Sequence, residues 1–156
     1  MDRVVFIVTI AAVIGSGLIA GTFFIFSVAI LPAFRQLPGE QAIAAMNRIN
    51  DVIQNATFLG IFLGTALVTT GLTVWSFLNW GRPGTGYLLI GSLLYIIGSF
   101  GVTVAFNVPL NNSLAGSNDP AIWNTYSARW TFWNHVRTLA SMLATGTLTV
   151  AAAFIA

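Results

Sequence analysis

Long apolar stretches separated by short polar ones dominate this chain. Asp, Glu, Lys, Arg and His are all absent from residues 4–34, 52–81, 83–118 and 138–156. A helix needs about 20 apolar residues to cross a hydrocarbon core of about 30 Å. The pattern therefore predicts four transmembrane helices in an all-α integral membrane four-helix bundle, with residues 1–156 forming a single transmembrane domain.

The segments between the spans differ in length. We expect the first span to cover residues 4–31 and stop at Pro32, and the third to cover residues 85–108 and stop near Pro109. Residues 79–84, Asn-Trp-Gly-Arg-Pro-Gly, predict a tight turn between the second and third spans. Both termini then lie on the side of this turn.

The longer links lie on the opposite side and are predicted to be helical. Pro38-Gly39-Glu40 reads as a helix start that runs straight into the second span at residues 52–78. Asn118-Asp119-Pro120 reads as a cap for one unbroken helix to residue 156, about 55 Å long. The second and fourth helices are therefore expected to extend beyond the membrane on one side.

Glycines at four- or seven-residue spacing predict where these helices touch, because small residues let backbones approach closely in lipid. The pairs are Gly17 with Gly21, Gly60 with Gly64, and Gly91 with Gly98. The alternative is that glycine is simply more frequent in membrane helices.

Composition narrows the function classes. Apolar residues make up 56% of the chain and charged residues 6%, against about 25% in soluble domains. The apolar run at the start is too long for a cleavable signal peptide, so we expect a multi-pass protein of the cell membrane. The six basic residues are scattered arginines, which argues against nucleic-acid binding. The absence of Cys excludes disulfides and thiolate metal sites.

Helical periodicity collects the polar residues of the fourth helix on one face. On a wheel of 100° per residue, one arc holds Trp123, Tyr126, Ser127, Trp130, Asn134, Arg137 and Ser141, with Asn124 and His135 at its shoulder. Phe132, Val136, Leu139 and Leu143 fall opposite. The second helix similarly groups Glu40, Asn47, Asn50, Asp51, Gln54 and Phe58.

Topology brings these two stripes to the same side of the membrane, together with Arg35 and residues 107–112, Asn-Val-Pro-Leu-Asn-Asn. Polar side chains at membrane depth normally face the bundle interior or a wet cavity. We therefore expect a pocket in one leaflet, with Trp and Tyr walls and with Asn, Arg and His groups. Small aromatic or lipid-like molecules are its expected ligands.

Each feature also has a simpler interpretation. Tryptophans near span ends commonly anchor a protein at the interface, the preferred interpretation for Trp133 and an equal alternative for Trp130. Arg137 stands where the fourth span enters the membrane and is expected to pair with Glu40 or Asp51, either structurally or for catalysis. His135 is the only histidine, and without Cys or a second His no metal or haem site is expected.

Four segments together resemble the anthrone oxygenase-like family of small four-helix membrane proteins. They are Gly21-Thr22-Phe23-Phe24-Ile25-Phe26-Ser27 followed by Pro32, Met46-Asn47-Arg48-Ile49-Asn50, Asn107-Val108-Pro109-Leu110-Asn111, and Trp123-X-X-Tyr126-X-X-X-Trp130-X-X-Trp133-Asn134-X-X-Arg137. The likeness spans most of the chain.

The resemblance implies oxidation of an anthrone-like flat aromatic by deprotonation and reaction with oxygen, without a cofactor. In this scheme His135 is the base, and Asn107, Asn134 and Arg137 complete the catalytic set. The substrate-binding residues are then Trp123, Tyr126, Trp130, Asn111, Asn47 and Asn50. The alternatives are a non-catalytic lipid- or quinone-binding protein and a structural membrane subunit, and association into a homo-oligomer stays open.

The arginine count does not fix the orientation. Arg35, Arg48, Arg129 and Arg137 lie on the pocket side, and Arg3 and Arg82 on the other. The bare count favours a cytoplasmic pocket. Glu40 and Asp51 offset part of that excess, so both orientations remain open.

Overall fold

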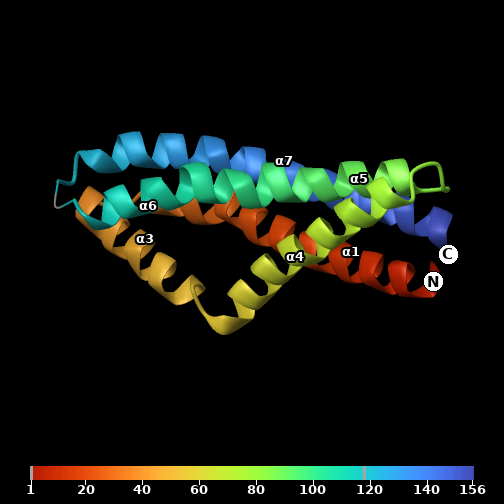
Figure 1. Ribbon diagram of the computed structural model, residues 1–156. Coiled ribbons are helices and arrows are strands. Elements are labelled where there is room, and N and C mark those ends of the chain that lie inside the picture. Colours follow the sequence, from red (N-terminus) through yellow and green to blue (C-terminus); the bar gives the residue numbers. More distant parts are fainter. Residues whose placement is uncertain (1, 118) are drawn as a thin grey trace.

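The computed structural model describes residues 2–117 and 119–156, which are almost entirely helical. Its elements follow one another in four groups, each containing one stretch long enough to cross a membrane (Figure 1). In chain order they are α1 (Asp2–Ile25), η1 (Phe26–Ile30) and α2 (Leu31–Phe34); α3 (Gly39–Ile53) and α4 (Ala56–Leu78); α5 (Thr85–Leu93), η2 (Leu94–Gly101), η3 (Thr103–Asn107) and α6 (Val108–Ala115); and α7 (Ile122–Ile155).

Four stretches of the described residues are long and apolar enough to cross a membrane. These are Arg3–Phe34, Ala56–Leu78, Thr85–Ala115 and Ile122–Ile155. Large apolar side chains such as Leu67 and Leu78 point outward, 75% and 79% exposed, as lipid-facing residues do. The chain is therefore a membrane protein with the predicted helical bundle.

The link between α4 and α5 is the predicted tight turn. Gly81 and Gly84 both adopt positive φ angles there, 95° and 82°, a conformation that favours glycine. The two chain ends lie beside this turn (Figure 1). The opposite end of the bundle, formed by α2, α3, α6 and the start of α7, is called the polar end below.

Proline does not stop the first and third spans, and the predicted stops at Pro32 and Pro109 are wrong. The N–H of Leu31 donates to the carbonyl of Phe26, and the N–H of Val108 donates to the carbonyl of Thr103. Each bond spans five residues, so Pro32 and Pro109 each follow a π-helical turn. A π turn is wider than an α turn and makes room for a ring that has no N–H to donate. The helices therefore continue to Phe34 and Ala115.

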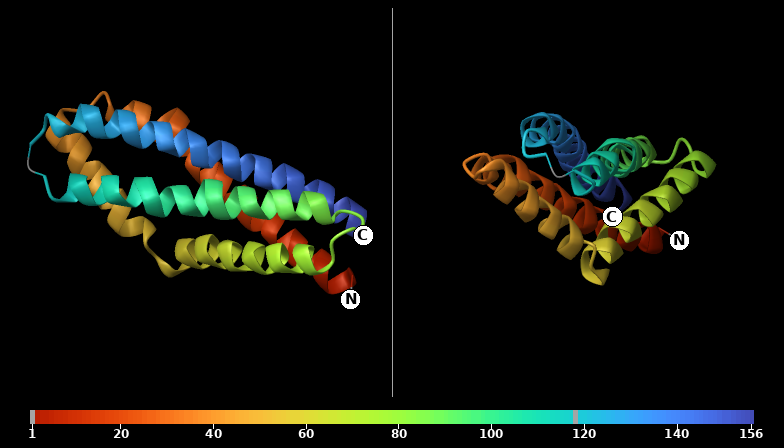
Figure 2. Two further views of the ribbon diagram at one scale, coloured as in Figure 1. Left: turned by 45° about the horizontal axis from the view of Figure 1, so that its top comes forward. Right: turned by 90° about the vertical axis from the view of Figure 1, so that its left-hand side faces the viewer.

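The second helix is broken, which corrects the prediction of a helix running straight from residue 39 into the membrane. Gln54 leaves the helical conformation with ψ 36°, and Asn55 is extended with ψ 161°. The Asn55 side chain accepts from Phe58 N at 3.0 Å and donates to Val52 O at 2.9 Å. Asparagine competes for backbone groups in this way and favours caps over helix interiors, so α3 and α4 meet at a corner (Figure 2).

The fourth helix meets its prediction more closely. α7 has 34 residues and starts at Ile122, after Asp119 Oδ1 accepts from Ala121 N at 2.9 Å. Asn118 of the predicted cap lies outside the described residues. At 1.5 Å per residue α7 is about 50 Å long, well beyond the hydrocarbon thickness.

Close glycine packing occurs in the third span. A Cβ built on Gly98 would lie 2.5 Å from the Ala140 side chain, and one on Gly91 would lie 2.7 Å from Leu148, both on α7. Such a Cβ on Gly17 would make only ordinary contact with Thr145, and Gly21, Gly60 and Gly64 have nothing within 4 Å. The predicted stripes of spans one and two are therefore not close-packed within the chain.

Candidate functional site

The polar face of α7 is the face that packs into the bundle. All seven residues of the predicted arc, from Trp123 to Ser141, are buried. The opposite arc carries Phe132, Leu139 and Leu143, which are 60%, 59% and 50% exposed. The predicted division of this helix into an inner polar face and an outer apolar face is confirmed.

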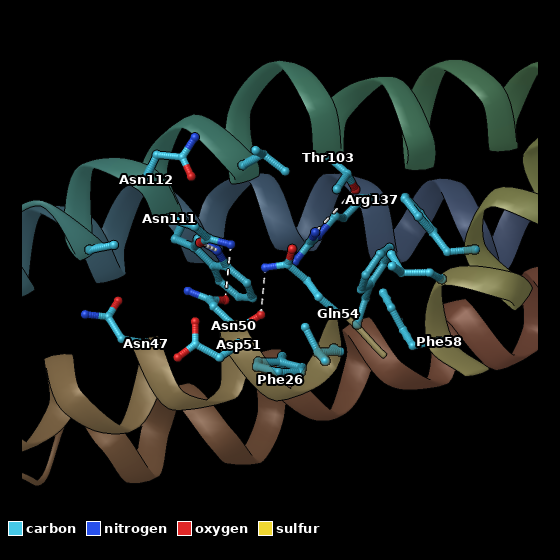
Figure 3. A pocket seen from close by; sticks show the side chains of 17 residues that line it. Phe26, Asn47, Asn50, Asp51, Gln54, Phe58, Thr103, Asn111, Asn112 and Arg137 are labelled. Carbon is cyan, nitrogen blue, oxygen red and sulfur yellow. Dashed lines mark hydrogen bonds between the residues drawn. The ribbon is translucent and has the colours of Figure 1, made fainter. Parts of the chain in front are cut away.

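A cavity of about 330 Å³ lies where the polar face of α7 meets the corner of α3 and α4 (Figure 3). Pockets for small molecules begin at about this size. Arg137 and Thr103 stand at its inner end, and Asn47, Asp51 and Asn112 at the other (Figure 3). The lining residues are Phe23, Phe26, Asn47, Asn50, Asp51, Ile53, Gln54, Phe58, Leu59, Phe62, Thr103, Val108, Asn111, Asn112, Ala115, Trp130 and Arg137.

Arg137 is held without a carboxylate. The side chain is 5% exposed, and its Nε donates to Asn134 Oδ1 at 2.9 Å while Nη1 donates to Thr103 Oγ1 at 3.3 Å. The guanidinium lies over the rings of Phe23 and Trp130, 3.9 and 4.8 Å from their centroids. The predicted ion pair with Glu40 or Asp51 is therefore wrong, because π faces and neutral oxygens take the place of the carboxylate.

Part of the guanidinium remains available to a ligand. The hydrogen bonds of Arg137 to described residues come from Nε and Nη1, so its Nη2 donates to none of them. Arginine has five N–H donors and no acceptor. Because this residue lines the cavity, its unused donors form a fixed positive site at the inner end.

Asn134 holds Arg137 in place and does not itself line the cavity. Its Nδ2 donates to Phe23 O at 2.7 Å and to Ser27 Oγ at 2.6 Å, while its Oδ1 accepts from Arg137. Asn134 is fully buried. The link ties α7 to the first helix at the π-helical turn of Phe26–Ile30.

Asn111 joins three elements on the opposite wall. Its Oδ1 accepts from the Tyr126 hydroxyl at 2.9 Å and from Trp130 Nε1 at 2.8 Å, and its Nδ2 donates to Asn50 Oδ1 at 3.1 Å. Buried aromatic N–H and O–H groups need such partners. One amide therefore fixes the ring of Trp130 against the cavity and connects α6 with α3 and α7.

Three asparagines carry buried atoms with no hydrogen-bond partner among the described residues. The atoms are Asn47 Oδ1, Asn50 Nδ2 and Asn107 Oδ1. Unpaired buried polar groups are rare, because each one costs about 1–3 kcal/mol. Asn47 and Asn50 also line the cavity, so its outer end is bordered by one buried acceptor and one buried donor without partners, on the same face of α3.

Several predicted site residues lie away from the cavity surface. Asn107, Asn134, Trp123 and Tyr126 are buried but do not line it. Trp123 packs in the core of the polar end beside Phe34, with ring centroids 6.5 Å apart. His135 is exposed and also lies outside the lining, since it belongs to the outer part of α7.

Other lining residues were not among the predicted site residues. Asp51, Gln54 and Phe58 lay on the predicted stripe of the second helix, and Phe23 and Phe26 in the segment with Gly21 and Ser27, so sequence signals existed for them. Thr103 and Phe62 belong to apolar spans, where nothing sets them apart from other Thr and Phe residues.

Among the described residues, Asp51 is the only carboxylate that lines the cavity. Among residues 2–117 and 119–156 no group of three or more His, Cys, Asp or Glu side chains is placed to hold a metal ion.

Comparison with known proteins gives one match. A family model described as anthrone oxygenase matches residues 55–147, which is more than half of the chain. The matched region contains α4 to most of α7, and with them Phe58, Thr103, Asn111, Trp130 and Arg137. No curated protein and no solved structure matches.

Proposed function

Because this chain belongs to the anthrone oxygenase family, we propose that it is a cell-membrane oxygenase whose cavity binds a flat, anthrone-like aromatic. In this proposal the protein oxidises the substrate by deprotonation and direct reaction with oxygen, without a cofactor. The observation that carries the proposal is Arg137, a buried cation without a carboxylate that faces an aromatic-walled cavity with unused donors.

The reaction needs modest machinery. An anthrone has a ring ketone opposite a methylene carbon, and loss of one methylene proton gives an enolate with its negative charge on the ketone oxygen. Molecular oxygen adds at the former methylene carbon and takes up a proton to form a hydroperoxide. Loss of water from the hydroperoxide leaves the second carbonyl. One anthrone and one O₂ thus yield one anthraquinone and one H₂O.

Arg137 suits the stabilisation of the enolate oxygen. The negative charge develops on that oxygen as the proton leaves, and a preorganised donor in a water-poor site stabilises such charge more in the transition state than in the ground state. The rings of Phe23 and Trp130 and the amide of Asn134 hold the guanidinium in place before substrate binds. Little reorganisation is then needed during the reaction.

Asp51 is the base that the geometry supports, in place of His135. No other carboxylate of the described part of the chain lines the cavity, and the exposed His135 does not line it. The unpaired Asn50 Nδ2 suits donation to a further oxygen atom of the substrate, and the unpaired Asn47 Oδ1 suits a substrate hydroxyl that donates to it. The aromatic walls contributed by Phe26, Phe58 and Trp130 suit a flat ring system.

The test is oxygen uptake coupled to anthraquinone formation by the purified protein in lipid vesicles, with anthrone as substrate and with autoxidation in empty vesicles subtracted. We expect Arg137→Gln to lower kcat by about 10²–10³, the range for loss of one oxyanion donor. His135→Ala lies on the same helix and is expected to leave kcat unchanged.

Equal loss in Arg137→Gln and His135→Ala would contradict the assigned roles. Tight anthraquinone binding without oxygen uptake would instead identify a quinone- or lipid-binding protein. If the folded protein shows no anthraquinone binding and no oxygen uptake, the result would favour a structural membrane subunit.

A further inference from the structure

The corner between α3 and α4 marks a level in the membrane. α4 has 23 residues and is about 35 Å long, close to one hydrocarbon thickness. The other three helical stretches have 31 to 34 residues and are about 46–51 Å long. All four reach the end with the tight turn and the termini (Figure 1), so the others pass the level at which α4 begins.

The cavity crosses that level. Phe58, Leu59 and Phe62 belong to the first two turns of α4, on the hydrocarbon side, whereas Asn47, Asn50 and Asp51 belong to α3 beyond it. Figure 3 shows the same division, with Phe58 near Arg137 and with Asn47 and Asp51 at the opposite end. One site therefore joins an aromatic inner part to an outer part of amides and one carboxylate.

α3 has the composition of a helix that lies at the membrane surface. Its Ala42, Ile43 and Met46 are buried against the core of the polar end, while Glu40, Gln41 and Arg48 are exposed. The apolar face of α3 is taken up by the protein and its outer face is charged, which suits the polar headgroup region better than hydrocarbon. The corner between α3 and α4 is therefore expected where headgroups meet hydrocarbon.

The side of the cavity next to this corner has an exposed rim. Asp51 on α3 and Gln54 just after it line the cavity opposite Val108, Asn112 and Ala115 on α6. All five are exposed. α3 bends away from the other helices at the corner (Figure 2). The rim mixes apolar and polar side chains, as an opening at the interface requires.

We propose that the cavity receives its substrate sideways from the bilayer, through a mouth between the corner and α6, and that the substrate is an aromatic amphiphile dissolved in the membrane. This inference rests on the proposed function for the identity of the substrate. The mouth itself is tested below without turnover.

The first experiment measures the depth of the rim. The chain has no Cys, so single-cysteine variants Gln54→Cys and Asn112→Cys take a unique spin label in reconstituted vesicles. Collision with dissolved oxygen and with a water-soluble nickel complex should place both labels at headgroup depth, and a label at Leu67→Cys, on the 75% exposed face of α4, deep in the hydrocarbon. The proposal would be overturned if the nickel complex reached the rim labels as easily as it reaches a label free in water. It would also be overturned if the rim labels lay as deep in the bilayer as the label at residue 67.

The second experiment measures the route with anthraquinone as probe, by the rate at which it quenches tryptophan fluorescence. At a constant total amount of anthraquinone, added lipid dilutes the probe within the bilayer. The rate of binding should then fall in proportion to the mole fraction of anthraquinone in the bilayer. Ala115→Trp, on the rim, should slow binding at least tenfold. Ser113→Trp, exposed on the same helix but outside the lining, should not.

The two hypotheses fail separately. Binding that follows the aqueous concentration and ignores Ala115→Trp would refute the lateral route even in an active oxygenase. Binding that follows the bilayer mole fraction and is slowed by Ala115→Trp would support the route even in a protein that consumes no oxygen.

Discussion

The two ends of this bundle satisfy their buried polar groups in different ways. Near the termini, buried hydroxyls donate to the carbonyl one turn earlier on their own helix: Thr9 to Val5, Ser16 to Ala12, Thr69 to Thr65 and Ser76 to Leu72, all at 2.7–2.8 Å. At the polar end, the amides of Asn111 and Asn134 bond across two or three elements, and the amides on α3 leave two atoms unpaired.

The difference separates stability from binding. A hydroxyl that bonds to its own helix is satisfied wherever that helix packs, so most hydroxyls of the terminal half need no partner from another helix. Thr145 additionally donates to Ser16 Oγ at 3.1 Å, and Ser92 Oγ has no partner among the described residues. An amide needs partners placed by the tertiary structure, and each missing partner is a free-energy cost that a ligand can remove. The contrast predicts that substitutions at the polar end affect stability and binding unequally.

The largest loss of stability is expected for Asn111→Leu. This change leaves the Tyr126 hydroxyl and Trp130 Nε1 without their acceptor, and each unpaired buried donor costs about 1–3 kcal/mol. We expect the free energy of unfolding to fall by about 3 kcal/mol, seen as a lower midpoint in thermal circular dichroism of the protein in detergent.

Asn112→Leu is the matched control, since it changes an exposed amide on the next position of α6. It should alter the free energy of unfolding by less than about 0.5 kcal/mol. Equal midpoints for the two variants would show that Asn111 does not connect the elements of the polar end.

The next largest effect belongs to the close-packed half. Gly98→Val places side-chain atoms where a Cβ alone would already lie 2.5 Å from Ala140. Overpacking of this kind costs about 1–3 kcal/mol. The thermal midpoint should fall clearly below that of the unmodified protein.

Gly64→Ala offers the comparison, because nothing lies within 4 Å of a Cβ at that position. Alanine is a better helix former than glycine by about 0.8–1.0 kcal/mol, so the midpoint should hold or rise. A fall as large as that of Gly98→Val would mean that residue 64 packs against another molecule, such as a second copy of the chain.

The smallest effect on stability is expected for Asn47→Leu. This change removes a buried acceptor that has no partner, so the free energy of unfolding should stay the same or rise slightly. Affinity for a hydroxyanthraquinone, whose O–H can donate to Asn47 Oδ1, should nevertheless fall about tenfold when measured by tryptophan quenching, as expected for one lost hydrogen bond of about 1.4 kcal/mol. Unchanged affinity together with lower stability would assign Asn47 to the fold and not to the ligand.

Periodicity and composition were enough to predict the four spans, the tight turn and the inner face of α7. They failed at Pro32, Pro109 and Asn55 for one shared reason. What a helix does at a proline or a capping residue depends on local backbone bonds, here two π turns and one side-chain cap. A charge-free run does not encode those bonds.

The site was predicted in part. The facing stripes correctly brought Asn47, Asn50, Asn111, Trp130 and Arg137 together, because topology alone places them at one end. A helical wheel gives the face on which a residue lies but not its partners on other helices. It therefore did not predict that Asn134 bonds to the first helix, or that aromatic rings replace a carboxylate around Arg137. His135 lies only one position from Asn134, yet that step of about 100° moves its side chain out of the bundle.

The length of α4 sets how this protein responds to bilayer thickness. With 23 residues, about 35 Å, it exceeds a hydrocarbon core of about 30 Å by only about 5 Å, whereas the other three stretches each have at least eight residues more. When the membrane thickens by a few ångströms, α4 is the first helix to experience hydrophobic mismatch. Less tilt of the helix or local thinning of the lipid relieves that mismatch. Since α4 turns at Asn55 into the helix that carries Asn47, Asn50 and Asp51, lipid chain length becomes mechanically coupled to the shape of the cavity.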